Sequence, residues 1–422
     1  MDSSDKDNDT EDHRHEDDDG NTGNRSGSAG LRNVTALGLV SFFTDFSTEM
    51  VLGVLPLFVI STLGASRAIL GAIEGSAELA GYAFRMVSGS LSDRTGRRKS
   101  FVLAGYAVSA ASKPFFAAST GWLDAFIVRT GDRIGKGIRT APRDALIADS
   151  VPESRAGKAF GLHRSIDQMG AVVGPIAAFA LLQIVDIRDI FLASLIPGIV
   201  ALVILVFFVK EVAVKARRKG AATMLGNIQG LVRGNRAFVV LLIVSGIFSL
   251  GAFNFSFVLL RSSDLGIQEN TIPLVYAVIN VSHAAIGIPS GIAADRVGKE
   301  KMLIVAFGIF LLSAVLMVYL SGDMLYAYVL AAVFGLYAGI SETVQRAVIP
   351  RYIPSESRGT AFGLYNIAIG SCLFVGNLMF GFLWDAYGLT VAATYSTTIA
   401  VVAISAMLVF IKTISPRFIP HQ

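Results

Sequence analysis

The strongest constraint on this chain is a sequence pattern that occurs twice, at one constant offset of 202 positions. Glycines, prolines and charged residues of the first part return at that offset in the second part. The matched positions are Gly89 and Gly291, Asp93 and Asp295, Arg94 and Arg296, Gly96 and Gly298, Pro152 and Pro354, Phe160 and Phe362, Gly161 and Gly363, and Gly174 and Gly376. One offset across four separate blocks indicates two homologous halves of about 200 residues each.

The composition is that of a membrane protein. Of the 422 residues, 53% are hydrophobic and 16% are charged, whereas a soluble protein carries about 25% charged residues. A membrane-spanning helix needs ~20 predominantly apolar residues. Clean apolar spans lie at 34–60, 101–120, 190–209, 238–260, 302–320 and 391–411, and spans interrupted by charges or glycine lie at 68–90, 122–147, 158–184, 271–294, 324–349 and 359–384. We expect an all-α integral membrane protein with twelve transmembrane helices in two six-helix halves.

The chain outside the predicted helices divides into three segments. Residues 1–30 contain ten acidic and three basic residues and no apolar stretch, so we expect a disordered acidic tail and no signal peptide. The halves are expected at 31–210 and 237–414, with a central loop at 211–236 and a short tail at 415–422. The single cysteine, Cys372, excludes a disulfide within the chain.

The basic residues predict the orientation. Residues 31–422 contain 33 basic and 22 acidic residues, and the basic residues of the connections lie mainly in alternate connections. These are Arg94, Arg97, Arg98 and Lys99 in one connection, Lys210, Lys215, Arg217, Arg218, Lys219, Arg233 and Arg236 around the central loop, and Arg296, Lys299, Lys301, Arg351 and Arg358 in later ones. Because basic loops stay on the cytoplasmic side, we expect a multi-pass plasma-membrane protein with both termini in the cytoplasm.

The first copy of the repeated motif has a recognisable pattern. It reads Gly-x-Leu-x-Asp-Arg-x-Gly-Arg-Arg-Lys from Gly89 to Lys99, and a weaker copy, Asp-Arg-x-Gly, begins at Asp295. It resembles the signature of the major facilitator superfamily, and the resemblance covers residue 34 to about residue 414. The resemblance implies the fold of that family, with a central cavity between the halves, and a secondary transporter that works by alternating access.

In that family the motif closes the cytoplasmic side in the outward-facing state. The residues to which the resemblance assigns this gating role are Gly89, Asp93, Arg94, Gly96, Arg97, Arg98, Asp295, Arg296 and Gly298. The alternative is that the charges only fix the orientation in the membrane. The basic run alone suffices for that purpose, but Asp93 does not serve it, so we favour the gate.

Ionisable residues within the predicted helices are the candidate binding and coupling residues, because burying a charge in a bilayer is expensive. They gather in the first half, at helical spacings and at similar depth. The candidates for substrate binding or proton coupling are Asp45, Glu49, Glu74, Glu78, Arg129, Arg133, His163, Asp167 and Glu342. Carboxylates beside arginines form ion pairs or take up protons, and four acids in one layer predict at least one that titrates near neutral pH. The alternative is a static network that only holds helices together.

A glycine–proline pattern bears on the direction of transport. The segment Gly170-Ala-Val-Val-Gly174-Pro175 resembles a pattern of antiporter branches of the family, although Ala178 and Phe179 stand in place of its paired glycines. Small residues at this spacing let helices pack closely. We therefore assign helix packing to Gly170, Gly174 and Pro175, and the resemblance favours an exporter.

The sequence thus predicts a proton-coupled antiporter that exports a small cationic or amphipathic, drug-like solute. The alternatives are a proton symporter for uptake of a metabolite, a metal-ion exporter and a membrane receptor that does not transport. No phosphate loop, zinc-ligand spacing or nucleophile elbow occurs, so we expect no enzyme, no cofactor and no bound metal. The expected partners are the lipid bilayer, a small-molecule substrate and protons, without nucleic acid, and the chain is expected to be a monomer.

Overall fold

A computed structural model describes residues 19–212, 224–353 and 358–413 of the chain. The predicted acidic tail therefore lies mostly outside the described residues, as do residues 213–223 of the central loop and the last nine residues. Helix α1 already begins at Asp19, within the segment for which the sequence predicts disorder. A short helix, α9 (Met224–Gly234), occupies part of the predicted central loop.

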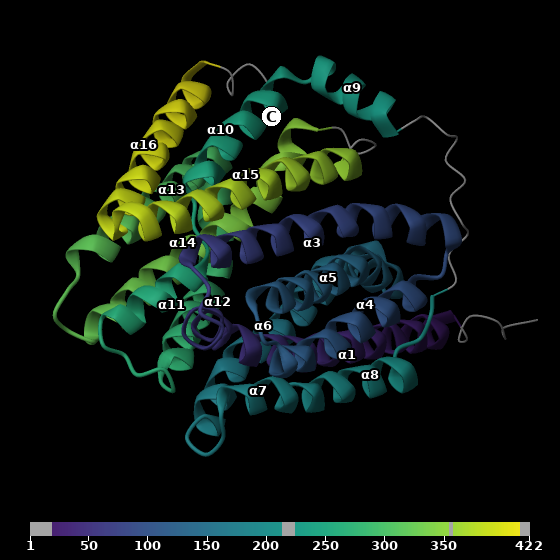
Figure 1. Ribbon diagram of the computed structural model, residues 1–422. Helices are drawn as coiled ribbons and strands as arrows, with labels where there is room; N and C mark the ends of the chain where they lie inside the picture. The colour runs from purple at the N-terminus through teal and green to yellow at the C-terminus, as the bar shows by residue number, and fades with distance from the viewer. Residues whose placement is uncertain (1–18, 213–223, 354–357, 414–422) are drawn as a thin grey trace, which may run out of the picture.

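The described residues are almost entirely helical (Figure 1). The first half contains α1 (Asp19–Leu52), α2 (Leu55–Leu57), the π-helical turn η1 (Phe58–Thr62), α3 (Arg67–Thr95), α4 (Arg98–Ser112), the 3-10 turn η2 (Lys113–Ala118), α5 (Trp122–Ser150), the 3-10 turn η3 (Glu153–Arg155), α6 (Ala156–Leu181), α7 (Ile187–Ala193) and α8 (Leu195–Phe208). The second half contains α10 (Arg236–Gly251), α11 (Phe255–Asp264), α12 (Ile272–Val297), α13 (Lys299–Tyr319), α14 (Leu325–Tyr352), α15 (Arg358–Tyr387) and α16 (Leu389–Thr413).

Twelve membrane spans follow from these helices when the short consecutive ones are joined. In the described part of the chain, nine of the spans are long and apolar enough to cross a bilayer by composition alone. The other three are α3, α5 and α6, which are 29, 29 and 26 residues long and carry most of the ionisable candidates. Helices satisfy their own backbone hydrogen bonds in lipid, which explains an all-helical architecture. The predicted fold class is confirmed.

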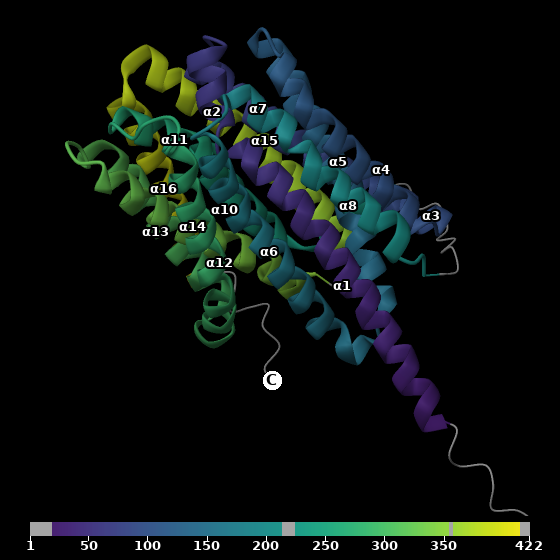
Figure 2. The same ribbon diagram turned by 90° about the horizontal axis from the view of Figure 1, so that it is seen from below.

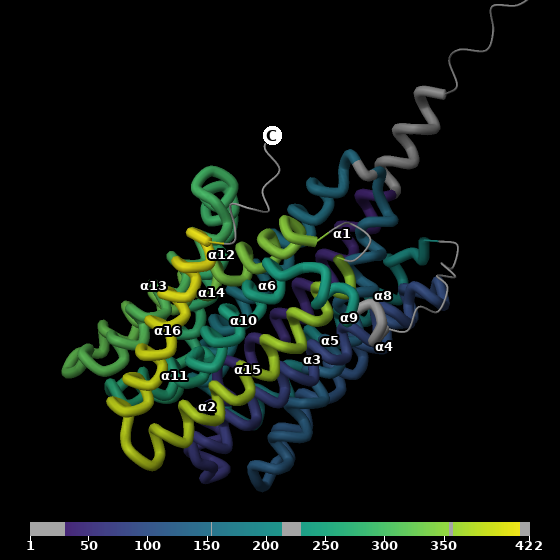
Figure 3. The backbone as a smooth tube through the Cα atoms, turned by 90° about the horizontal axis from the view of Figure 1, so that it is seen from above, coloured from purple at the N-terminus to yellow at the C-terminus, as the bar shows by residue number. Residues whose placement is uncertain are grey.

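The two halves meet along two pairs of helices. Within the first half α1 packs against α6 and α5 against α3 and α4, and within the second half α14 packs against α12 and α13. Between the halves, α3 lies along α15 and α6 lies along α12. Figure 1 shows α3 and α15 side by side across the middle of the molecule. Figures 2 and 3 show the long helices running along one another in a single bundle.

The sequence repeat recurs as a repeat in helix packing. A Cβ atom on Gly137 of α5 would lie 2.5 Å from the carbonyl oxygen of Gly81 on α3. A Cβ atom on Gly339 of α14 would lie 2.5 Å from the carbonyl oxygen of His283 on α12. Both residues of the second contact are 202 positions beyond those of the first. The same close helix crossing is therefore present in both halves.

The interiors of the halves differ in chemistry. In the second half, aromatic rings fill the core, with the rings of Phe248 and Phe307 stacked at 3.8 Å and Phe253 lying 4.6 Å from Phe380 between ring centroids. In the first half, charged side chains such as Arg129 are almost fully buried. The polar interior of the first half is where the candidate site lies.

The predicted packing glycines of α6 lie directly against α1. A Cβ atom on Gly170 would lie 2.2 Å from the carbonyl oxygen of Phe42, and one on Gly174 would lie 2.7 Å from that of Phe46. Pro175 follows inside the same helix. The two backbones are therefore in contact, and no larger residue fits at either glycine.

This geometry predicts the effect of a matched pair of substitutions in α6. We expect Gly170→Ala to destabilise the protein by about 1–3 kcal/mol, because the new methyl group overlaps the backbone of α1. We expect Gly161→Ala, where nothing lies within 4 Å of the new methyl group, to be neutral or stabilising by up to ~1 kcal/mol. Thermal unfolding of the purified protein in detergent measures both. Equal midpoints for the two variants would contradict the packing role.

Candidate functional site

The most deeply buried charges form one group between α3 and α5. The Arg129 guanidinium donates hydrogen bonds from Nε and Nη2 to the two carboxylate oxygens of Glu74, at 3.2 and 2.7 Å. Its Nη1 lies 3.3 Å from Asp132, whose other oxygen accepts a hydrogen bond from Ser109 at 2.6 Å. Glu74 and Arg129 are 0% and 1% exposed. This bidentate ion pair holds α3 against α5.

A second ion pair lies one turn further along the same helices. Arg133 Nη2 lies 2.9 Å from Glu78 Oε1, and Arg133 is the more buried of the two. Close by, the fully buried Lys113 of η2 donates a hydrogen bond to Thr48 of α1 at 3.0 Å. Two of the four predicted acids are thus paired with the two predicted arginines.

The other two predicted acids, Asp45 and Glu49 on α1, form no ion pair within the described part of the chain. Glu49 Oε2 accepts hydrogen bonds from the Tyr276 hydroxyl at 2.5 Å and from Asn280 Nδ2 at 3.4 Å, both on α12. The Asp45 carboxyl lies close enough to that of Asp167 on α6 for the two groups to interact. Two neighbouring carboxyl groups repel each other when both are ionised, so Asp45 and Asp167 form a candidate proton site.

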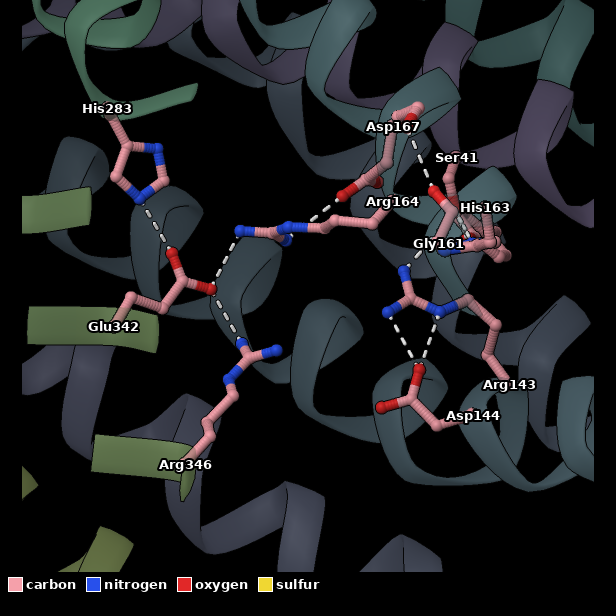
Figure 4. A network of polar contacts seen from close by, with 12 residues as sticks. Ser41, Arg143, Asp144, Gly161, His163, Arg164, Asp167, His283, Glu342 and Arg346 are labelled. Carbon is pink, nitrogen blue, oxygen red and sulfur yellow. Dashed lines mark hydrogen bonds and ion pairs between the residues drawn. The ribbon is translucent and has the colours of Figure 1, made fainter. Parts of the chain in front are cut away.

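A polar bridge connects the two halves near the proton site (Figure 4). Arg164 of α6 lies 3.2 Å from Asp167 through Nη1 and 2.9 Å from Glu342 of α14 through Nη2. Glu342 also accepts a hydrogen bond from Arg346 at 2.7 Å and contacts His283 Nε2 at 2.8 Å. Figure 4 shows these three side chains converging on the one carboxylate. The bridge links the Asp45–Asp167 pair to the second half of the protein.

His163 belongs to a separate hydrogen-bonded chain. Its Nε2 lies 2.9 Å from the hydroxyl of Ser41, which also contacts the Tyr106 hydroxyl at 2.9 Å. Arg143 donates to the same Ser41 hydroxyl at 3.3 Å and to Asp144 at 2.9 Å. His163 and Asp167 share a helix face, as predicted, but in the described structure the imidazole bonds to Ser41 and not to Asp167.

The motif residues lie at one end of the bundle, where α3 ends and α4 begins; we call it the motif end. Gly96 has φ of 66° and ends α3, with its N–H donating to Ser92 O, and Gly298 has φ of 109° and ends α12. A left-handed φ at this turn favours glycine, which accounts for both positions. A Cβ atom on Gly89 would lie 3.1 Å from the Cβ atom of Ala141 on α5.

The motif acids are both exposed and contact their own halves. Asp93 Oδ1 lies 3.6 Å from Arg98, and Asp295 lies 3.9 Å from Lys299. Their side chains are 61% and 75% exposed. Arg94 and Arg97 lie in the same turn, and Arg296 lies in the last turn of α12. In this structure the predicted gate residues therefore make no ion pair across the halves among the described residues.

A pair of ion pairs at the motif end preserves the repeat with the charges exchanged. Arg98 at the start of α4 pairs with Asp149 near the end of α5. Exactly 202 positions later, Glu300 at the start of α13 pairs with Arg351 near the end of α14 at 2.9 Å. The Tyr352 hydroxyl adds a hydrogen bond to Glu300 at 2.5 Å. Position and partner are the same in both halves, and only the sign of each charge is reversed.

The other end of the bundle, where α3 begins, carries ion pairs between the halves. Arg67 lies 3.8 Å from Asp264 of α11 and 3.7 Å from Asp385 of α15, and its guanidinium stacks over Trp384 at 4.8 Å. The backbone N–H of Ala68 donates to Asp385 at 2.8 Å, at the N-terminus of α3. A carboxylate at a helix N-terminus is favourable. We call this end the Arg67 end.

Sequence reasoning missed several residues that the structure brings into the site. Tyr276 and Lys113 lie in apolar segments, and a single tyrosine or a lysine at a span boundary carries no spacing signal. Arg164 is one of the ionisable residues of its predicted helix, three residues before Asp167, but the sequence assigns it no role in binding or coupling. In the described residues no three His, Cys, Asp or Glu side chains gather as a possible metal site.

Comparison with known proteins gives the family. The sequence profile of the Major Facilitator Superfamily matches residues 37–377 and 239–420. A transporter of this type from Methanocaldococcus jannaschii, itself uncharacterised, is 31% identical over 362 residues, covering 84% of this chain and 88% of the relative. A multidrug resistance protein, MdtG, of Salmonella paratyphi B is 23% identical over 284 residues, covering 65% of this chain and 70% of the relative.

Solved structures agree in fold. The nucleoside transporter NupG superposes with a TM-score of 0.76 at 14% identity, covering 90% of this chain and all of that one. A POT family transporter in complex with 5-aminolevulinic acid superposes with a TM-score of 0.77 at 14% identity, covering 92% and 97%. The chain is a multi-pass membrane transporter and not an enzyme. It belongs to the Major Facilitator Superfamily.

The buried Glu74–Arg129 pair predicts a contrast between single and double substitutions. We expect Glu74→Gln to destabilise the protein by about 3 kcal/mol or more, because it leaves a buried guanidinium short of a counter-charge. Replacing both partners, by Glu74→Leu with Arg129→Met, removes both charges and is expected to recover most of that loss. Thermal unfolding and size-exclusion profiles measure this. A fully stable Glu74→Gln variant would exclude the structural role.

The exchanged charges at the motif end predict that the first-half pair tolerates reversal. Arg98→Glu alone is expected to destabilise the protein, because it places two carboxylates together. Arg98→Glu with Asp149→Arg reproduces the arrangement of Glu300 and Arg351, and we expect a coupling energy of about 1–3 kcal/mol between the two substitutions. A double-mutant cycle of thermal unfolding measures it. Additive effects of the two changes would contradict the equivalence of the pairs.

Proposed function

We propose that the protein is a proton-coupled secondary transporter that exports a small organic solute by alternating access. The observation that carries this proposal is the close approach of the Asp45 carboxyl group on α1 to that of Asp167 on α6. Two carboxyl groups in contact cannot both ionise without strong repulsion. A change in the environment of either one therefore binds or releases a proton.

The position of this pair supports coupling to solute. Asp167 pairs with Arg164, and Arg164 pairs with Glu342 of the other half. A rocking motion of the halves that separates Arg164 from Glu342 alters the positive charge next to Asp167. Proton affinity at the pair and the relative position of the halves are then linked, which is what a coupled carrier requires.

We further propose that the motif end is cytoplasmic and that this structure is closed at the Arg67 end. The basic connections favour that orientation. The cross-half ion pairs of Arg67 and the contact of Glu49 with Tyr276 join the halves on the Arg67 side, while Asp93 and Asp295 contact only their own halves. In the opposite state we expect Asp93 to engage the second half, in line with the gating role.

Two observations support export over uptake. The name of the Salmonella relative describes multidrug resistance, and the Gly170–Pro175 segment resembles the antiporter pattern. Proton symport is the second candidate, and it is favoured by a separate observation. Glu74 and Glu78 are paired with arginines, whereas Arg164 and Arg346 remain exposed to solvent.

The test is proton movement in vesicles that contain the purified protein. A pH gradient is imposed, a pH-sensitive dye reports the interior, and a panel of anionic, neutral and cationic solutes is added. We expect one class of solute to move protons with wild type, and Asp45→Asn to abolish proton movement because the amide does not take up a proton. Glu269→Gln, an exposed surface acid, is the matched control and is expected to behave as wild type.

The direction of the flux separates the two candidates. If protons leave the vesicle as solute enters it, the protein is an antiporter. If protons and solute cross the membrane in the same direction, it is a symporter. Asp45→Asn with undiminished proton movement would overturn the assignment of the proton site.

A further inference from the structure

Four arginines gather in one layer on the motif side of the proton site, between the two halves. Arg85 lies on α3, Arg143 on α5, Arg164 on α6 and Arg346 on α14; we call them the arginine cluster. Each lies between six and ten residues from the motif end of its own helix. At 1.5 Å per residue, this is about 9–15 Å inside the bundle.

The acids near the arginine cluster leave one arginine without an ion pair. The acids in electrostatic range are Asp144, Glu342, Asp45 and Asp167. Asp144 pairs with Arg143, and Glu342 pairs with both Arg164 and Arg346. None of these ion pairs includes Arg85.

Arg85 is the arginine without a partner. Its half-buried guanidinium forms no hydrogen bond or ion pair with any residue that the structure describes, and it lies in electrostatic range of Asp144, Arg143 and Arg346. Two arginines that face each other in the interior of a membrane protein repel. An unpaired guanidinium in such a place is costly unless another anion joins it.

Glu342 shows what kind of group the cluster holds. One of its oxygens accepts hydrogen bonds from Arg164 at 2.9 Å and from Arg346 at 2.7 Å, and the other contacts His283 at 2.8 Å. A carboxylate is thus held by donors from α6, α12 and α14, as Figure 4 shows. The same donors suit a carboxylate or phosphate that arrives from solution.

The site is accessible. The side chains of Arg164 and Arg346 are 43% and 56% exposed, and Glu342 is 33% exposed. By contrast, Arg129 of the static pair is 1% exposed. Solute that enters between the halves meets the arginine cluster and not the deeply buried pairs.

We propose that the arginine cluster binds the oxyanion of the transported solute, so that the substrate is a small organic molecule bearing a carboxylate or a phosphate. Arg85 and Arg346 are its main ligands, and Arg164 connects it to the second half and to the proton site. This inference rests on the proposed transport function but not on the direction of proton movement. It differs from the cationic solute expected from the sequence, because two of the four acids behind that expectation, Glu74 and Glu78, are paired with arginines.

The test is direct binding to the purified full chain in detergent, without a gradient. The probes are acetate, succinate, benzoate, inorganic phosphate and phenyl phosphate, with benzyl alcohol and benzylamine as neutral and cationic matches to benzoate. Thermal stabilisation reports binding. We expect at least one anion to stabilise wild type in a saturable manner, while benzyl alcohol and benzylamine do not. Comparing carboxylates with phosphates of similar size distinguishes the two oxyanions.

Arg85→Gln is the decisive variant, because Arg85 has no described partner to lose and the fold should survive. Loss of a charge-assisted hydrogen bond is expected to weaken anion binding by about 10-fold or more. Arg346→Gln is expected to act in the same way. Arg233→Gln removes an exposed arginine at the end of α9 and is expected to bind as wild type.

Three outcomes overturn the proposal. Stabilisation by benzylamine and by none of the anions would establish a cationic site. Equal stabilisation of wild type and Arg85→Gln by anions would place binding on the basic loops. No stabilisation by any anion would exclude an oxyanion site in this layer. Anion binding without proton movement in the vesicle assay would leave the site intact and contradict only the proposed coupling.

Discussion

The structure depends on ion pairs between charged side chains that would be unstable inside a bilayer if either partner were alone. Arg129 and Glu74 are almost completely excluded from solvent, and each is acceptable in that place only because the other meets it with two hydrogen bonds. Helices α3 and α5 are therefore obligatory neighbours, and the glycines at their crossing bring the backbones close enough for the pair to form. The polar interior of the first half follows from this pairing. The core of the second half is held by packed aromatic rings and does not depend on a buried ion pair of this kind.

The contacts between the halves are of another kind. Arg67, Glu49 and Arg164 reach across with ion pairs or hydrogen bonds, and the pairs of Arg67 and Arg164 retain some exposure to solvent. Exposed pairs contribute little stability, so they form and break at small cost. Permanent pairs thus lie within a half and exchangeable ones between halves. This division suits two rigid bodies that move relative to each other.

The sequence predicted the helices and the repeat and placed acids and arginines at one depth in the first half, because hydropathy, a fixed offset and helical spacing are local signals. It did not predict which acids would be left without an arginine. That depends on contacts between α1, α6 and α12, which no spacing within one helix encodes: Glu49 meets Tyr276, and Asp45 meets Asp167. The cationic solute was inferred from a count of acids. A count of acids ignores their pairing with arginines, and that pairing decides the charge that a solute meets.

The Glu74–Arg129 pair also has a consequence for the synthesis of the protein. The two residues are 55 positions apart, so α3 leaves the ribosome before its counter-charge exists. Insertion of a charged residue at the centre of a lone helix is unfavourable by a few kcal/mol. The final buried position of Glu74 is therefore stable only once α5 has been made, because its counter-charge comes from a later helix.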